Sequence, residues 1–212
     1  MRGLIAKDVY LIVKMNKKLL LAMYVFSIAL VFLGKDNIYA LGSSVFFALI
    51  IGMHLVMTLT YDGLSHWKKY EIILPMTVFQ VVGVKYILTL FCAFISIIAT
   101  ILIYGLHYLY SSAFSWEMLG ISIFIAGIIP IIWCSCCFPL AYWFGYMNIQ
   151  YVRMIGLLLL IFIFNRRNVI AGIETEVMIR NIVSHPETVI LFIIVFWAMS
   201  YAISILGYKR KK

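Results

Sequence analysis

Charged side chains are scarce in this sequence of 212 residues: Asp, Glu, Lys and Arg make up 12% of it, and hydrophobic residues make up 65%. Soluble globular domains carry about 25% charged residues, so the composition excludes that class and predicts an integral membrane protein. The formal net charge of +9 indicates membrane topology and contact with anionic lipids rather than nucleic-acid binding.

Two familiar sequence motifs are missing. No Gly-x-x-x-x-Gly-Lys-Ser/Thr phosphate loop is present, so any ATP that drives this protein is hydrolysed by another chain. No cleavable signal peptide is evident, because the first apolar run begins only at Leu19 and lacks a small-residue cleavage site behind it. The first span should therefore be retained, and we expect a single domain over residues 1–212 with no cofactor of its own.

Residues able to bind metals or act in catalysis are also few. Cys92 and the Cys134–Cys137 cluster lie inside apolar runs without the spacing of a zinc site or a disulfide framework, which favours buried apolar thiols over a metal or redox site. His54 and His107 have no carboxylate or cysteine at helical spacing, which favours polar contacts between helices over a catalytic base. We expect no catalytic or metal-binding residue, and an intramembrane enzyme remains an alternative.

Long uncharged runs predict an all-α membrane protein with six transmembrane helices, because about 20 apolar residues suffice to span a bilayer. The 35 uncharged residues from Met118 to Val152 are too many for one span, and a turn at residues 145–150 divides them. Pro130 and Pro139 each remove a backbone donor from the fourth span, which predicts a kink that serves either gating or packing. The expected spans are residues 19–34, 38–61, 79–107, 117–145, 149–165 and 188–208.

The basic residues indicate the orientation of these spans. When the loops are assigned alternately to the two sides, 13 Lys and Arg residues fall on one side and 4 on the other. This excess predicts a multi-pass protein of the plasma membrane with both termini in the cytoplasm. Residues 1–18 are expected to form an interfacial amphipathic helix, and an ordinary basic flank of the first span is the alternative. Its apolar face would comprise Leu4, Ile5, Val9, Ile12 and Val13, and its basic face Lys7, Lys14 and Lys18.

The most informative interruption between apolar runs is the aromatic-rich segment of residues 62–77, between the second and third spans. Trp67, Tyr70 and Leu74 fall at i, i+3 and i+7, on one face of a short helix that Pro75 ends. Because Trp and Tyr dominate the energetics of protein interfaces, we expect a cytoplasmic helix that docks a soluble partner. A helix that lies on the membrane surface is the alternative.

The order of features around this segment resembles the ABC-2 type permeases, the transmembrane subunits of bacterial ATP-driven exporters. Shared features are a basic amphipathic N-terminus, two spans, an acidic residue followed by aromatics, a Leu-Pro-x-Ser/Thr motif, and a Lys-Tyr pair that opens the third span. In this chain they read Asp62, Trp67, Tyr70, Leu74-Pro75-Met76-Thr77 and Lys85-Tyr86.

The resemblance implies half of a transporter. Two permease chains, identical or different, would pair through their first and fifth spans, and each would dock an ATP-binding subunit that holds ATP and Mg. Residues 165–187, with Ile170, Ile173, Val177 and Ile182, would form short external helices. Compact permeases that export phenol-soluble modulins or antimicrobial peptides are the most similar, which implies an amphipathic peptide as cargo; a non-transporting scaffold or anchor is a further alternative. The docking helix implied for the ATP-binding subunit comprises Asp62, His66, Trp67, Lys68, Lys69, Tyr70, Glu71, Leu74 and Pro75.

Overall fold

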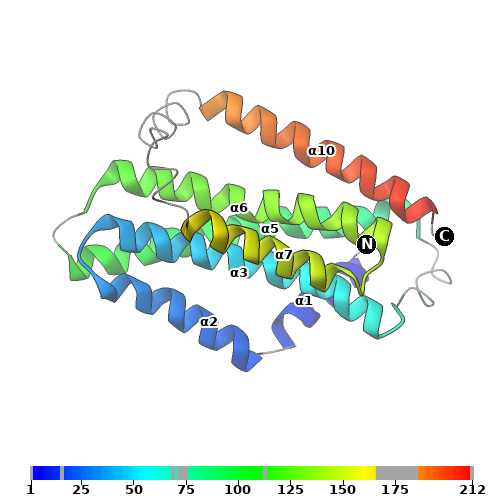
Figure 1. Ribbon diagram of the computed structural model, residues 1–212, viewed down its shortest axis with the longest axis horizontal. Coiled ribbons are helices and arrows are strands. Elements are labelled where there is room, and N and C mark those ends of the chain that lie inside the picture. Colours follow the sequence, from blue (N-terminus) through cyan, green and yellow to red (C-terminus); the bar gives the residue numbers. More distant parts are fainter. Residues whose placement is uncertain are drawn as a thin grey trace.

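The computed structural model describes residues 2–14, 17–67, 70, 76–111, 114–165 and 186–210, and these residues form helices and short connections without strands (Figure 1). The all-α class is therefore confirmed for this part of the chain. The elements are α1 (Arg2–Lys14), α2 (Lys17–Ala29), the 3-10 helix η1 (Leu30–Leu33), α3 (Asn37–Leu64), α5 (Val78–Tyr110), α6 (Trp116–Phe144), α7 (Ile149–Asn165) and α10 (Pro186–Arg210).

Four of the described helices, α3, α5, α6 and α10, are long and apolar enough to cross a membrane. The remaining candidates are shorter. The helix α7 has 17 residues, which rise about 25 Å against a hydrocarbon core about 30 Å thick, and α2 with η1 covers a similar length. The prediction of a multi-pass helical membrane protein is confirmed, whereas the count of six spans stays a prediction.

The long helices lie side by side, with α3, α5 and α6 packed against one another and α10 against α6 and α5 (Figure 1). One end of this bundle, called here the charged end, carries α1, the end of α3, the start of α5 and the end of α10. The opposite end carries the start of α3 and the end of α5, where Ser111 Oγ donates to the Lys35 carbonyl. Most of the predicted external segment, residues 166–185 with its four apolar residues, lies outside the described residues.

The helix α6 runs unbroken as an α-helix through both of its prolines. A proline lacks the N–H that would bind the carbonyl four residues earlier, so Pro139 leaves the Ser135 carbonyl without its helical donor. Ser200 of α10 supplies a replacement, because its Oγ donates to the Ser135 carbonyl at 2.6 Å. The helix is therefore not interrupted at the prolines, and a neighbouring helix satisfies the carbonyl that Pro139 frees. The predicted kink stays a prediction.

Close approach between α3 and α6 depends on a glycine. A Cβ built on Gly52 would lie 3.3 Å from the Cα of Pro130, and Cys134 Sγ donates to the Gly52 carbonyl at 3.7 Å. Small residues let helix backbones approach within a bilayer, where lipid tails compete with every apolar contact. Gly52 thus sets the spacing between the two helices that flank the core.

We expect Gly52→Val to destabilise the fold by about 1–3 kcal/mol, the usual cost of overpacking a core. The added methyl groups would meet backbone atoms of Pro130, which cannot rotate away. Gly42→Val on the same helix is the matched control, since a Cβ there meets nothing within 4 Å. Thermal unfolding in detergent measures both variants, and equal melting temperatures for the two would contradict this packing account.

Candidate functional site

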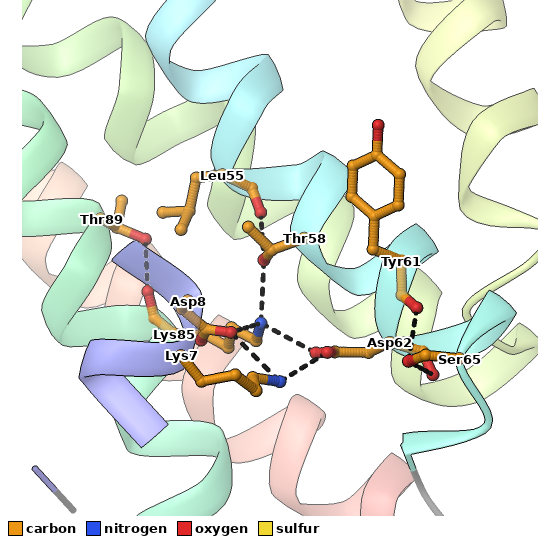
Figure 2. Close-up of polar contacts among 9 residues, drawn as sticks. All are labelled: Lys7, Asp8, Leu55, Thr58, Tyr61, Asp62, Ser65, Lys85 and Thr89. Atoms are coloured by element: carbon orange, nitrogen blue, oxygen red, sulfur yellow. Dashed lines mark hydrogen bonds and ion pairs between the residues drawn. The ribbon is translucent and has the colours of Figure 1, made fainter. Parts of the chain in front are cut away.

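Three helices meet at the charged end of the bundle, where Figure 2 shows side chains from α1, α3 and α5 directed toward one another. The group comprises two bases and two acids, Lys7, Asp8, Asp62 and Lys85, and is called here the charge cluster. Its members come from residues far apart in the sequence, and its formal charge is zero. It borders the connection between α3 and α5, the segment that contains the aromatic residues.

The sequence itself ends α3 beside the cluster. Ser65 donates both its backbone N–H, at 2.9 Å, and its Oγ, at 2.8 Å, to the Tyr61 carbonyl, so the last turn closes on itself. His66 then takes a left-handed backbone conformation with φ 52°, which ends a helix and is uncommon for a residue other than glycine. The chain therefore leaves α3 about one turn after Asp62.

The start of α5 is equally well defined. Thr77 is its N-cap: the Gln80 N–H donates to Thr77 Oγ1 at 3.3 Å, and the Thr77 N–H donates to Gln80 Oε1 at 3.2 Å. This reciprocal pair is a capping box, which satisfies two backbone donors that a helix start leaves open. The Thr of the Leu-Pro-x-Ser/Thr motif thus has a structural purpose, since it sets where α5 begins.

Lys85 is the centre of the cluster, because its ammonium has three donors and all three are used. Its Nζ donates to Asp8 Oδ1 at 2.9 Å, to Asp62 Oδ2 at 3.0 Å and to Thr58 Oγ1 at 2.8 Å (Figure 2). Thr58 can accept this bond because its own proton goes to the Leu55 carbonyl at 2.7 Å. Only 5% of the Lys85 side chain is exposed, so the ammonium has exchanged water for a complete shell of protein oxygens.

The acids are shared between the two lysines. Asp62 receives Lys85 on Oδ2 and Lys7 on Oδ1, and Asp8 Oδ1 lies 3.3 Å from Lys7 Nζ. The Asp8 side chain is fully buried, and its Oδ2 has no hydrogen-bond partner within the described part of the chain. Removing one partner from such a buried pair costs more than the pair itself contributes, because a charge stays buried without compensation.

The aromatic residues of the connection lie beside the cluster. The Lys7 Nζ sits 4.3 Å from the centre of the Trp67 ring, a cation–π contact. Trp67 and Tyr70 both have helical backbone, and their ring centres are 6.3 Å apart, as expected for neighbours on one helix face. Tyr70 is 61% exposed, so one aromatic is fixed to the bundle and the next faces outward.

The structure divides the predicted docking residues into three groups. Asp62 is buried in the last turn of α3 and paired inside the chain, so it holds the connection rather than forming its surface. His66 and Tyr70 are exposed, and Trp67 is half-buried against Lys7. The other five predicted residues, Lys68, Lys69, Glu71, Leu74 and Pro75, lie outside the described residues.

The expected interfacial helix is shorter and turned differently from the prediction. It ends at Lys14, and α2 begins at Lys17. Lys7, expected on a solvent-facing basic side, points into the bundle with Asp8, whereas the apolar Val9 and Val13 are exposed. The reason is electrostatic: the carboxylates of Asp8 and Asp62 hold the Lys7 ammonium inside, which leaves apolar residues of α1 on the exposed side.

Sequence reasoning missed Asp8 and the pairing role of Lys85. Two signals could have identified them. Asp8 follows Leu4 and precedes Ile12 at four-residue spacing, so an acid stands on an apolar helix face. Lys85 stands two turns inside α5 with apolar residues on either side, and an ionisable residue within a span usually has a partner and a function.

The remaining candidates form no catalytic arrangement among the described residues. His54 Nδ1 lies 2.8 Å from the carbonyl of Ile50 on its own helix, so the expected contact between helices is not the bond it makes. His107 is fully buried, with neither ring nitrogen hydrogen-bonded within this part of the chain. Cys136 is exposed, whereas the other three cysteines are buried, and no cluster of metal-binding side chains occurs in the residues described.

Comparison with known families identifies the architecture. A family model described as "ABC-2 family transporter protein" matches residues 3–209, which includes the charge cluster, the connection and every described long helix. No curated protein and no solved structure matches the chain significantly.

Lys85→Met should destabilise the fold by about 3–5 kcal/mol, because it leaves two buried carboxylates, Asp8 and Asp62, with only the partly exposed Lys7 of the cluster to compensate them. Adding Asp8→Asn and Asp62→Asn to that variant should recover much of the loss, since amides bury at lower cost than carboxylates. Lys209→Met, which removes an exposed lysine, is the control. Unfolding in detergent by heat or denaturant provides the measurement, and a Lys85→Met protein as stable as the control would refute the central position of Lys85.

Proposed function

Because the chain belongs to the ABC-2 family of transporter proteins, we propose that it is the permease subunit of an ATP-driven exporter and that a separate subunit hydrolyses the ATP. Members of this family are membrane subunits of transporters and are generally not catalytic by themselves. In this proposal both termini and the charged end face the cytoplasm, as the distribution of Lys and Arg predicts. Two permease chains and two ATP-binding subunits make up the complex.

The observation that carries the proposal is the attachment of the α3–α5 connection to the charge cluster. Asp62 stands at the end of α3 just before the connection, and Lys85 stands two turns after its end. The two side chains bind each other at 3.0 Å. A force on the connection therefore acts on both helices at a common point, which is the property a coupling segment requires.

The docking surface is the aromatic face of this connection. Trp67 and Tyr70 enter a groove of the ATP-binding subunit, together with Leu74, while Lys68, Lys69 and Glu71 lie at its rim. The half-buried Trp67 is positioned in advance by Lys7, which lowers the entropy cost of docking. Closure of the ATP-bound subunits then pushes on the connection and rocks α3 and α5.

The cargo in this proposal is an amphipathic or hydrophobic peptide, of the kind represented by phenol-soluble modulins and antimicrobial peptides. Among the described residues, the buried carboxylates and the buried ammonium, those of Asp8, Asp62 and Lys85, all belong to the charge cluster and bind one another. The long helices therefore offer buried hydroxyls and aromatic rings but no buried charge for a hydrophilic solute. That chemistry suits a cargo recognised through apolar surface.

The experiment that tests this function is reconstitution in nanodiscs with an ATP-binding cassette subunit that co-purifies with the chain. Vanadate-sensitive ATP hydrolysis should increase when an amphipathic helical peptide is added. Failure of every cassette subunit of the host to bind the chain would contradict the proposal.

Within that complex, Trp67→Ala should weaken docking by about 2 kcal/mol or more, the scale of an interface hot spot. Tyr70→Ala should add to the loss, because its exposed ring is the neighbouring contact. Surface plasmon resonance on the nanodisc-embedded permease measures the affinity.

Trp116→Ala and Tyr108→Ala are the matched controls. These aromatics are 78% and 64% exposed but lie at the opposite end of the bundle. If the Trp67→Ala, Tyr70→Ala double variant binds and stimulates the ATP-binding subunit as the control pair does, the docking assignment is wrong.

A further inference from the structure

The residue that follows Lys85 makes a second polar junction, on another side of α5. Tyr86 is 1% exposed, and its OH lies 2.6 Å from Ser200 Oγ and 2.8 Å from Ser204 Oγ, both on α10. Successive residues of a helix point about 100° apart. Lys85 therefore connects α5 to α1 and α3, while Tyr86 connects the same turn of α5 to α10.

The junction extends to α6 through the carbonyl that Pro139 frees. Ser200 Oγ donates to the Ser135 carbonyl at 2.6 Å, so its proton is committed and its oxygen accepts from the Tyr86 hydroxyl. The Tyr86 ring also packs edge-on against Phe138 of α6 and Trp197 of α10, with centres 5.2 and 5.6 Å away. Three helices are thus joined around one tyrosine.

The helix α10 runs at an angle to α6 (Figure 1), and its buried residues are distributed unevenly along its length. Hydrogen bonds join residues 200–204 of α10 to Tyr86, Ser135, Trp143 and Phe79 on the other described helices. Ile193 is the only buried residue in the half before Ser200, where Leu191, Phe192 and Ile194 are each more than half exposed. Since buried contacts hold helices together in lipid, α10 is fixed most firmly from Ser200 onward, where five of its six buried residues lie.

We propose that Lys85 and Tyr86 form one rigid junction that passes a displacement of α3 to α10, which pivots about Ser200 and Ser204 so that its outer half separates from α5 and α6. Tyr86, Ser200 and Ser204 are then positioning residues for transport, and the pivot opens the outer half of the bundle toward lipid. The junction itself belongs to this chain alone. That ATP binding in a partner subunit moves it rests on the proposed function.

Hydrogen–deuterium exchange of the permease alone, in nanodiscs, tests the junction. Asp62→Asn disturbs the charge cluster on α3, which connects to α10 only through α5 in this proposal. The variant should speed exchange of the α10 amides by about threefold to tenfold, the scale of one interhelical hydrogen bond in a bilayer. In a Tyr86→Phe protein α10 should exchange faster from the start, and Asp62→Asn should add nothing. If the Asp62 variant fails to fold, Lys7→Met replaces it, because Lys7 is the most exposed member of the cluster. Exchange in α10 is then compared with and without Tyr86→Phe.

Tyr104→Phe is the matched control. Tyr104 is also buried on α5, and its OH lies 2.6 Å from Ser122 Oγ, but this bond joins α5 to α6. In that background Asp62→Asn should still speed exchange in α10. The junction is refuted if disturbing the cluster alters α1 and α3 but leaves α10 unchanged, or if the α10 response persists without the Tyr86 hydroxyl.

A second arm separates the junction from the proposed function. In complex with the ATP-binding subunit, trapping with ATP and vanadate should change α10 exchange in the unmodified chain and not in the Tyr86→Phe chain. An α10 that responds to Asp62→Asn but not to trapping would support the junction and overturn its use in ATP-driven transport.

Discussion

The fold depends on one ammonium group inside an apolar bundle. Lys85 could not remain charged there unless protein atoms replaced its water, and three oxygens from α1 and α3 do so. This requirement determines the rest of the charged end: Asp8 brings in α1, Asp62 fixes the end of α3, and Lys7 balances the second acid. The short N-terminal helix is consequently a structural part of the bundle as well as a contact to lipid.

Polar contacts determine this arrangement because the hydrophobic effect does not drive helices together inside a bilayer. Lipid tails are as apolar as leucine, so helices associate through small residues, close packing and hydrogen bonds worth about 0.6 kcal/mol each on average. Gly52 and the serines at 200 and 204 are such points of attachment. Burial along α10 is uneven, because one residue before Ser200 is buried and five from Ser200 onward are. The proposed pivot of α10 depends on this difference between its two halves.

The sequence predicted the class of this protein well and the site incompletely. Long apolar runs are local features, so the helical membrane fold and the four longest helices could be expected from composition alone. The aromatic connection was found in the same way. The pairing of Asp8 with Lys85 spans 77 residues, and no periodicity within one segment reveals such a partner. The family resemblance placed Asp62 in the docking helix, whereas its carboxylate binds Lys85 from the last turns of α3, which continues to Leu64.

The central claim is that an ATP-binding subunit docks on the connection that the charge cluster supports. A photo-crosslinking amino acid in place of Tyr70, with the same group in place of Tyr108 as the comparison, tests it most directly in intact cells. Both positions are exposed, 61% and 64%, and lie at opposite ends of the bundle. The account predicts an adduct with the ATP-binding subunit from position 70 and none from position 108. An adduct from position 108 alone would reverse the orientation and contradict the account.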